Sequence, residues 1–352
     1  MYGAERAILV LAEGSPDRSV VGCFDDPRTG FVELARVAAG RGIDSVAVPC
    51  AGAFDPMAVR RLTTVIRDRG IDVVHSHGYK ASFYGLPAAR MARRGFVVTL
   101  HGMTAVTRAV RVYEHLQMKS LALGDAVAAV SPALTERARH HAGDVPVRYV
   151  PNGIDVDRTC ASAEGEAPTN GVYFAVVGRL AKEKGLDVLV EAVARIRDRL
   201  ARHGARVVLM GDGPLRADLE VRSAALGVSS LVELRGFSPD PLPWMRHAIA
   251  VLMPSYTEGL PYTALEAMAI GTPLLATRVG ALPELVEDDD SGLLVPAGDV
   301  DALAEGMSRL LEEPALRARL GLRGQQVVRE GWGAAAMGRR YDQEVYVHAR
   351  RV

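Results

Sequence analysis

The stretch Ser255-Tyr-Thr-Glu258-Gly-Leu-Pro-Tyr-Thr-Ala-Leu-Glu266-Ala-Met-Ala-Ile-Gly271 decides how this chain folds. The apolar run Ala248-Ile-Ala-Val-Leu-Met-Pro254 precedes it and is typical of a buried parallel strand. Apolar residues then recur at helical spacing until Gly271, with Pro273 beyond. The sequence therefore predicts a strand, a loop and a helix, which is the repeating unit of an open α/β fold.

Two carboxylates stand in this stretch with seven residues between them. Glu258 is expected in the loop that leaves the strand, and Glu266 about two turns into the next helix. Open α/β sheets bind ligands at that end of the strands, where free backbone N–H groups also suit a phosphate. Two solvated glutamates are the ordinary alternative, so the interpretation depends on the rest of the chain.

Length and composition restrict the class of protein. With 352 residues, 49% of them apolar and 24% charged, the chain predicts two domains of a soluble globular protein. Three scattered cysteines favour a reducing compartment, and neither a membrane span of ~18 residues nor a secretory signal is recognisable. We therefore expect a cytoplasmic protein. A pI near 7.1 and few aromatic residues argue against a nucleic-acid partner.

Charge is distributed unevenly between the two halves. Residues 1–152 contain 19 Lys/Arg against 14 Asp/Glu, and the remainder contains 23 against 28. A basic first half favours an anionic or lipid-linked acceptor, and peripheral contact with the inner face of a membrane. Chance scatter of surface charge is the alternative.

The first half predicts alternating strands and helices with an unusual start. Residues 4–13 predict a helix after a turn at Gly3, although Ala7–Leu11 could instead be the first strand. Ser131 and Pro132 predict the N-cap and first residue of a later helix. The other predicted strands are 19–24, 45–48, 72–77, 96–100, 126–130 and 147–150, and the other helices are 31–40, 56–69 and 81–93.

Three histidines follow or end two of these strands. His75 and His77 share one face of a strand, and His101 comes directly after the next strand. Their number favours a site over ordinary structural roles, but no carboxylate or cysteine stands near enough in sequence to suggest zinc. Basic side chains that could contact an anionic acceptor or a membrane, or merely be solvated, are Lys80, Arg108 and Arg111.

The second half repeats the α/β alternation. A strand over 172–177 breaks into Gly178-Arg179-Leu-Ala-Lys182-Glu-Lys184-Gly185, which has glycines and cations where a phosphate cradle would have them. This loop is neither a Walker loop nor G-x-G-x-x-G. Residues 158–170 predict an exposed loop. The other predicted strands are 207–210, 232–234, 249–254, 273–277 and 292–295, and the helices are 186–202, 300–312 and 332–350.

These motifs resemble those of a family 4 glycosyltransferase with the GT-B fold, in which two Rossmann-like, doubly wound parallel-sheet domains face each other across a cleft. The resemblance is carried by Gly178-Arg179…Lys184-Gly185, Gly211-Asp-Gly213, the Glu258/Glu266 pair and Pro151-Asn-Gly153, and more loosely by Asp72-Val-Val-His75-Ser-His77, Leu100-His101-Gly102 and Ala129-Val-Ser131. It implies an acceptor-side domain over 1–152, a nucleotide-sugar-binding domain over 153–331, and a terminal helix over 332–352 that packs back on the first domain.

The resemblance also implies roles for single residues. Arg179 and Lys184 would bind the nucleotide diphosphate, and Glu266 would hold the ribose. Glu258 would hold the donor sugar hydroxyls, and His101 would contact that sugar near the reacting centre. The further donor-binding residues would be Gly3, Gly178, Gly211, Gly213, Arg235, Gly236, Phe237, Gly259, Leu260, Pro261 and Tyr262. The acceptor-side residues would be His75, His77, Lys80, Arg108 and Arg111.

The implied activity is transfer of a hexosyl or N-acetylhexosaminyl group from a UDP- or GDP-sugar to a hydroxyl of a glycan, glycolipid or small molecule, as in cell-envelope or polysaccharide biosynthesis. The family retains the anomeric configuration and needs no metal cofactor. Two alternatives are a sugar-nucleotide 2-epimerase and a non-catalytic nucleotide-sugar-binding subunit.

The chain departs from the family pattern at its start, where members have a strand, a glycine pair and then Ala-Glu. Tyr2-Gly3-Ala4-Glu5 resembles only the second glycine and the Ala-Glu after it. We therefore expect the given chain to begin inside this motif and its first domain to lack the central strand, which would leave the polypeptide unstable or inactive.

Overall fold

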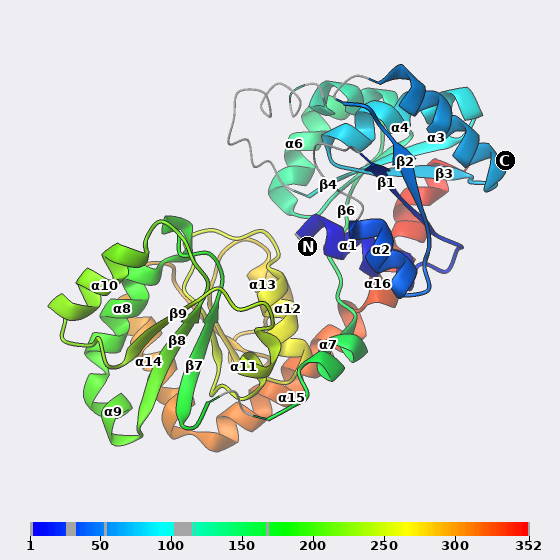
Figure 1. Ribbon diagram of the computed structural model, residues 1–352. Helices are drawn as coiled ribbons and strands as arrows, with labels where there is room; N and C mark the ends of the chain where they lie inside the picture. The colour runs from blue at the N-terminus through cyan, green and yellow to red at the C-terminus, as the bar shows by residue number, and fades with distance from the viewer. Residues whose placement is uncertain are drawn as a thin grey trace. The chain divides into compact units, whose positions relative to one another are not determined.

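The computed structural model describes residues 3–25, 33–52, 55–101, 115, 117–166 and 169–350. The chain divides into two compact units (Figure 1). The N-terminal unit comprises Met1–Gly153 and Ala334–Val352, and the C-terminal unit comprises Ile154–Gly333. None of the described helices is long and apolar enough to cross a lipid bilayer.

The C-terminal unit is built on one parallel sheet of six strands, in the order β12-β11-β10-β7-β8-β9. The chain runs from β7 outward to β8 and β9, then returns to β10 on the other side of β7. The strands are β7 (Val172–Val177), β8 (Ala205–Met210), β9 (Val232–Gly236), β10 (Val251–Met253), β11 (Leu274–Thr277) and β12 (Leu293–Val295). Each predicted strand of this half is present.

Helices cover both faces of this sheet, and an apolar cluster fills each interface (Figure 1). They are α7 (Val156–Ser162), α8 (Leu186–Arg195), α9 (Arg197–Arg202), α10 (Arg216–Ala225), α11 (Leu242–Arg246), α12 (Tyr262–Ala269), α13 (Leu282–Leu285), α14 (Val300–Glu312) and α15 (Pro314–Gly331). The predicted loop over 158–170 is wrong at its start, because the Asp155 side chain accepts from Arg158 N and caps α7. The helix predicted over 186–202 breaks at Ile196, whose ψ of 16° is not helical.

The N-terminal unit has two separate parallel sheets, one of β1-β2 and one of β3-β4-β5-β6. The strands are β1 (Val20–Asp25), β2 (Asp44–Pro49), β3 (Val73–His77), β4 (Gly95–Leu100), β5 (Ala126–Ala129) and β6 (Val147–Tyr149). The helices are α1 (Gly3–Gly14), α2 (Glu33–Gly40), α3 (Pro56–Asp68), α4 (Tyr79–Ala92) and α6 (Pro132–Ala142).

The helix expected over residues 4–13 is confirmed, and the alternative of a strand over Ala7–Leu11 is wrong. Ala7, Leu9 and Leu11 are buried on α1, so the short apolar run packs as a helix face. The predicted cap of α6 is also confirmed, since Ser131 Oγ accepts a hydrogen bond from Leu134 N.

The C-terminal segment of this unit is not the single helix predicted over 332–350. It begins as α16 (Ala334–Arg340), continues as one π-helical turn over Tyr341–Val345, and ends as a 3-10 turn over Tyr346–His348. Tyr341 and Val345 are fully buried. The change of helix type accompanies hydrogen bonds from the buried Tyr341 and the half-buried Tyr346 to polar partners on β4 and β3.

Candidate functional site

The candidate site in the C-terminal unit lies where the strand order reverses. β7 and β10 are neighbours, but the chain leaves β7 toward β8 on one side and leaves β10 toward β11 on the other. The loops after two such strands diverge and leave a crevice at the carboxyl edge of the sheet. A cavity there is lined by Val176, Val177, Gly178, Arg179, Lys184, Leu186, Leu252, Met253, Pro254, Ser255 and Glu258.

Lys184 and Glu258 meet in this cavity. Lys184 Nζ lies 2.7 Å from Glu258 Oε1, and Ser255 Oγ donates to the same oxygen at 2.7 Å. The Glu258 side chain is 8% exposed and that of Lys184 27%, so the pair is shielded but not sealed from water. The residues predicted to bind the diphosphate (Lys184) and the donor sugar (Glu258) are thus in direct contact, although 74 positions separate them in sequence.

Backbone packing fixes the two loops against each other. Gly185 has φ +59°, and a Cβ atom there would lie 2.0 Å from the carbonyl oxygen of Pro254. Tyr256 N donates to the carbonyl oxygen of Glu183 at 2.9 Å. Only glycine satisfies both the left-handed backbone and the close approach at position 185. This explains why a glycine follows the lysine.

Arg179 lies on the outer rim of the same cavity. Its guanidinium donates to Glu183 Oε1 at 2.6 Å, and its side chain is 67% exposed. The hydrogen bond from Arg179 lowers the pKa of the Glu183 carboxyl. An exposed guanidinium on a surface carboxylate is weakly held, so it can exchange this partner for an incoming anion.

The glycine turn after β8 packs beside the turn after β7. A Cβ atom on Gly211 would lie 1.8 Å from the carbonyl oxygen of Gly178, and Leu180 N donates to Asp212 O at 3.0 Å. Gly213 N donates to the side chain of Asp212. The structure therefore places the predicted residues Gly178, Gly211 and Gly213 at one edge of the sheet.

The second glutamate of the opening motif is buried. Glu266 is 4% exposed on α12, where it is the fifth residue and hence just over one turn from the start, not the two turns expected. The helix begins only at Tyr262, because the backbone of Pro261 before it is extended, with ψ 132°. Pro261 has no N–H, so this predicted donor-binding residue cannot donate a backbone hydrogen bond to a ligand. Gly259 is exposed and Leu260 is buried.

The predicted donor-binding residues Arg235, Gly236 and Phe237 lie at the carboxyl end of β9, whose last residue is Gly236. Phe237 is 80% exposed, the largest exposed fraction among the large hydrophobic side chains of the described chain. The guanidinium of Arg235 lies 4.1 Å from the ring centroid of Trp244 and also contacts Glu233. Gly236, between Arg235 and Phe237 in the sequence, has φ +84°. An aromatic ring left in solvent at the edge of the sheet is suited to stacking on a planar base.

The N-terminal unit brings its three predicted histidines together. His77 Nδ1 lies 2.7 Å from His101 Nε2, and the His75 and His77 rings lie 4.2 Å apart. Burial lowers the pKa of His101 to about 4 and that of His75 to about 3, with the His101 charge as a smaller cause for His75. Burial also holds the pKa of His77 well below its usual range. The rings are therefore neutral at physiological pH.

The remaining predicted residues are less informative. Lys80 Nζ lies over the Phe24 ring at 5.7 Å, and Gly3 begins α1. Arg108 and Arg111 lie outside the described residues. In the part of the chain that the structure describes, no group of three or more His, Cys, Asp or Glu side chains is arranged to hold a metal ion.

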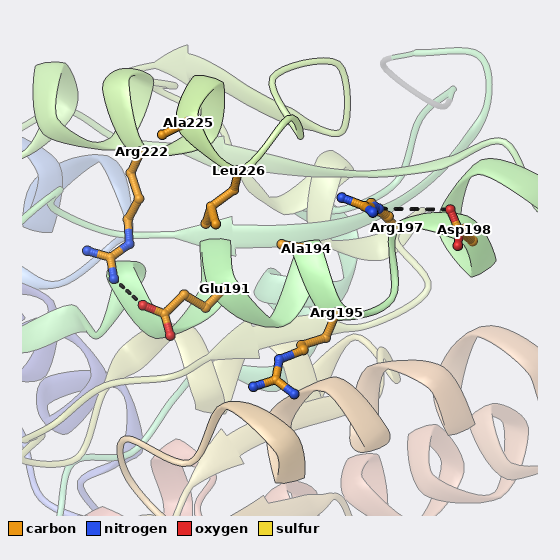
Figure 2. Close-up of a pocket in the computed structure, with 8 residues that line it drawn as sticks. All are labelled: Glu191, Ala194, Arg195, Arg197, Asp198, Arg222, Ala225 and Leu226. Carbon is orange, nitrogen blue, oxygen red and sulfur yellow. Dashed lines mark hydrogen bonds and ion pairs between the residues drawn. The ribbon is translucent and has the colours of Figure 1, made fainter.

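A second depression lies elsewhere on the C-terminal unit, between α8 and α10 (Figure 2). Its arginines already face carboxylates: Arg222 contacts Glu191, and Arg195 lies 3.1 Å from Asp301. Figure 2 shows Arg222 and Glu191 pointing toward each other, joined by a dashed line. No predicted residue lines it, and its charges are already paired, so we do not regard it as a substrate site.

Sequence reasoning missed Ser255 and Thr277. Ser255 is 1% exposed and binds Glu258 directly, while Thr277 Oγ1 donates to Ser255 O at 2.6 Å. Serine and threonine at strand ends are common, and neither residue has a spacing that marks it. The signal available was position alone, since Thr277 ends β11 and Ser255 lies two residues beyond the end of β10, the neighbouring strand.

Both units match known protein families. The family described as glycosyl transferases group 1 matches residues 157–327, and glycosyltransferase family 4 matches residues 1–158. A D-inositol 3-phosphate glycosyltransferase of Streptomyces bingchenggensis is 31% identical over 309 residues, which are 80% of this chain and 67% of the relative. The enzyme of that name from Frankia alni is 34% identical over 76% of this chain and 72% of its own length.

A 2-deoxystreptamine glucosyltransferase of Streptomyces kanamyceticus is 34% identical over 66% of this chain and 65% of its own length. The chain thus spans about two thirds of the length of these relatives. Among solved structures, Anabaena HepE in complex with UDP has a TM-score of 0.77 at 21% identity, covering 98% of this chain and 96% of that one. The same protein with UDP-glucose has a TM-score of 0.74 at 20% identity, covering 99% and 96%.

Proposed function

Because the chain belongs to the glycosyltransferases of group 1 and family 4, with the GT-B fold, we propose that it transfers a sugar from a UDP-sugar to an acceptor hydroxyl with retention and without a metal ion. The fold class and the glycosyltransferase enzyme expected from the sequence are confirmed. The donor, the stereochemistry, the metal independence and the roles of single residues are proposals.

One observation supports the proposal most strongly. The Lys184–Glu258 pair lies at the reversal point of the sheet, at 2.7 Å, with Arg179 on the rim. A diphosphate needs cations, and a sugar needs a carboxylate that accepts from its hydroxyls. Lys184 would exchange Glu258 for the diphosphate, and this exchange would free Glu258 to accept hydrogen bonds from the sugar.

The other donor groups follow from position. Glu266 would accept from the ribose hydroxyls, and the exposed Phe237 ring would stack on the base. The backbone N–H groups at the start of α12 carry partial positive charge and would face phosphate or sugar oxygens. His101 of the N-terminal unit is proposed to contact the donor sugar, as expected from its place in the Leu100-His101-Gly102 motif.

The reaction breaks the bond between the sugar C1 and the diphosphate oxygen and forms a bond from C1 to the acceptor oxygen. With retention, the acceptor attacks from the face that the nucleotide leaves, and its proton passes to the departing phosphate, which leaves as UDP. Lys184 and Arg179 would stabilise the negative charge that develops on that phosphate. The electrostatic stabilisation of the leaving group would then come from cations held in fixed positions.

The test uses the full chain with UDP-glucose and EDTA. We expect UDP release that depends on an acceptor, a product whose anomeric linkage by NMR matches the donor, and turnover unaffected by EDTA. Lys184→Ala and Glu258→Gln should each lower turnover at least tenfold, while Lys182→Ala on the exposed side of the same turn should not. Full activity of both site variants contradicts the proposed site. Epimerised free sugar would indicate the epimerase alternative, and UDP binding without turnover the non-catalytic one.

For the acceptor we propose a cyclohexane polyol. Two of the relatives are named for D-inositol 3-phosphate and for 2-deoxystreptamine, both of which are cyclitols. A panel of myo-inositol, D-inositol 3-phosphate, 2-deoxystreptamine and a lipid-linked sugar separates this class from lipid acceptors. Turnover with the lipid-linked sugar alone would contradict the cyclitol proposal.

We also propose that α4 brings the N-terminal unit to an anionic membrane surface. Its residues 79, 83, 87 and 91 are apolar or aromatic and all exposed, with Tyr79, Phe83 and Met91 at 38%, 47% and 49%. The helix contains no acidic residue, and Arg93 follows it. Such a face suits a lipid interface. We expect the protein to sediment with phosphatidylglycerol vesicles but not with phosphatidylcholine vesicles. The Phe83→Ser variant should no longer sediment with phosphatidylglycerol. Equal binding to both lipids contradicts the proposal.

A further inference from the structure

Side chains from three segments of the N-terminal unit form a chain of contacts that ends at His101. β3 and β4 pair in parallel with His77 opposite Thr99. Because strand side chains alternate between faces, His75, His77 and Thr99 lie on one face of the sheet, and His101 continues that face beyond β4. The C-terminal segment after α16 places Tyr341 and Tyr346 against this face.

The contacts leave little freedom to the rings. His75 Nδ1 lies 2.9 Å from Tyr346 Oη, and His75 Nε2 lies 2.6 Å from Thr99 Oγ1, so both nitrogens of His75 are occupied. Thr99 Oγ1 in turn lies 2.9 Å from Tyr341 Oη. His75 therefore cannot rotate without breaking two hydrogen bonds. It packs at 4.2 Å from His77, whose Nδ1 is the partner of His101.

The π-helical turn is what allows both tyrosines to reach this face. In an α-helix, residues five apart point about 140° away from each other, because each residue turns by ~100°. Here Tyr346 N donates to Tyr341 O, an i→i+5 bond that widens the turn and brings both side chains to one side. Such single π turns are rare and occur frequently at functional sites.

From this arrangement we infer that His77 is a positioning residue for His101, and that Tyr341 and Tyr346 act on His101 indirectly by fixing the His75–His77 stack. The inference rests on the proposed role of His101 at the donor sugar. His77 itself is assigned no contact with substrate, which differs from the acceptor-side role expected from the sequence.

The hydrogen-bonding capacity of the two rings explains how His77 would act. A neutral imidazole has one N–H, so a single proton lies between His77 Nδ1 and His101 Nε2. That contact fixes the orientation of the His101 ring and leaves its Nδ1 as the nitrogen available to a ligand. Removing His77 would leave the His101 ring free to rotate. When a group that contacts the substrate is loosely held, transition-state stabilisation typically falls more than ground-state binding.

The experiment measures kcat and KM for UDP release from UDP-glucose together with the ring nitrogen shifts of His101 by 15N NMR. His77→Phe keeps a ring but removes the hydrogen bond, and should lower kcat about 10- to 100-fold with KM within about threefold. His77→Asn, which can restore a partner to His101, should recover part of the loss. Tyr346→Phe should lower kcat several-fold and shift the His101 nitrogens in the same direction.

Two controls remove comparable groups without touching this chain of contacts. Tyr173→Phe deletes a buried hydroxyl that donates to Trp244 O at 2.9 Å in the other unit, and Gln343→Ala truncates an exposed side chain within the π turn. Both should leave kcat and the His101 shifts unchanged.

The outcomes separate this inference from the proposed function. If His101→Ala abolishes turnover but His77→Phe and Tyr346→Phe leave kcat and the His101 shifts at wild-type values, the inference is overturned. If His101→Ala is fully active, the role of His101 in the proposed function fails instead. The His101 nitrogen shifts in the tyrosine variants then still show whether the C-terminal segment fixes the positions of the histidines.

Discussion

The ammonium of Lys184 has one carboxylate partner in the cavity, Glu258, which is almost fully buried. Lys184→Met keeps the apolar stem but leaves that carboxylate without its cation. We expect the free energy of unfolding to fall by about 1–3 kcal/mol, since the pair is only partly sealed from water. We expect the affinity for UDP to fall about 10- to 100-fold, as for a lost charged hydrogen bond. Calorimetric titration with UDP and urea unfolding measure the two effects.

Lys182→Met is the matched control, because Lys182 is exposed in the same turn and does not line the cavity. It should change neither quantity. Equal loss of UDP affinity in both variants would show that general positive charge, and not the position of Lys184, holds the nucleotide.

A second prediction at this scale concerns Ser255. Ser255→Ala removes the hydroxyl that donates to Glu258 Oε1 but leaves Lys184 in place. Glu258 should then be less well oriented, and we expect kcat to fall about tenfold while affinity for UDP alone is unchanged, because UDP contains no donor sugar. A parallel loss of UDP affinity would place Ser255 at the phosphates.

Single residues were predictable from sequence where a motif marks them. Lys184 and Glu258 stand in glycine-bounded loops, and this pattern identified both before the structure showed their contact. The partners of His75 could not be found this way, because Tyr346 is 271 positions away and a tyrosine in a terminal helix has no distinguishing spacing. Long-range hydrogen bonds depend on tertiary packing that no local pattern encodes.

Among the elements, the turn that ends in Gly185 should tolerate little change. Gly185→Ala would combine a left-handed backbone with a Cβ atom 2.0 Å from Pro254 O, so backbone must move. We expect a loss of stability well above the ~1–2 kcal/mol of the left-handed conformation alone, and loss of UDP binding because the β7 and β10 loops separate. Thermal unfolding with and without UDP tests both.

Gly227→Ala supplies the control for backbone conformation. Gly227 has φ +68° at the end of α10, and a Cβ atom there would meet nothing within 4 Å. It should cost only the left-handed conformation and leave UDP binding intact. If Gly185→Ala behaves like Gly227→Ala, the close approach of the two loops is not rigid.

Elements were predicted well where hydrophobic period and capping agree. Strands β7, β10 and β12 are continuous apolar runs, and α6 has both its serine cap and its proline. The break at Ile196 and the π turn after Arg340 were missed, because both sequences keep a helical apolar period through the irregularity. The spacing of apolar residues alone cannot distinguish an α turn from a π turn when further buried residues continue the pattern after it.

At the scale of the whole molecule, the two units should respond differently to acid. The half-buried His75 and His101 have pKa values lowered by desolvation to about 3 and about 4, whereas the histidines of the C-terminal unit, His203 and His247, are exposed. Below pH 6.5 the unfolded chain binds protons that the folded N-terminal unit does not, so its stability falls as pH falls toward 4. Between pH 7.5 and 5 the loss is about 2 kcal/mol per histidine.

The chain has two tryptophans, and both belong to the C-terminal unit. Urea unfolding followed by tryptophan fluorescence should therefore keep its midpoint between pH 7.5 and 5, while circular dichroism shows a transition that moves to lower urea. His75→Gln should reduce the pH slope of that transition by about one proton. A fluorescence midpoint that moves together with the circular dichroism transition would contradict separate responses.

The two sheets of the N-terminal unit have a consequence for how copies of the chain behave together. Within the described residues, β1 pairs only with β2, and β3 pairs only with β4, so β1 and β3 each have one unpaired edge. The residues of β1 and β3 are partly exposed, whereas those of the central strand β4 are all buried. An open edge is a template on which another chain can add a strand. Among the residues that the structure describes, the N-terminal unit has four sheet edges and the C-terminal unit has two, so we expect self-association and aggregation to begin at the N-terminal unit as concentration rises.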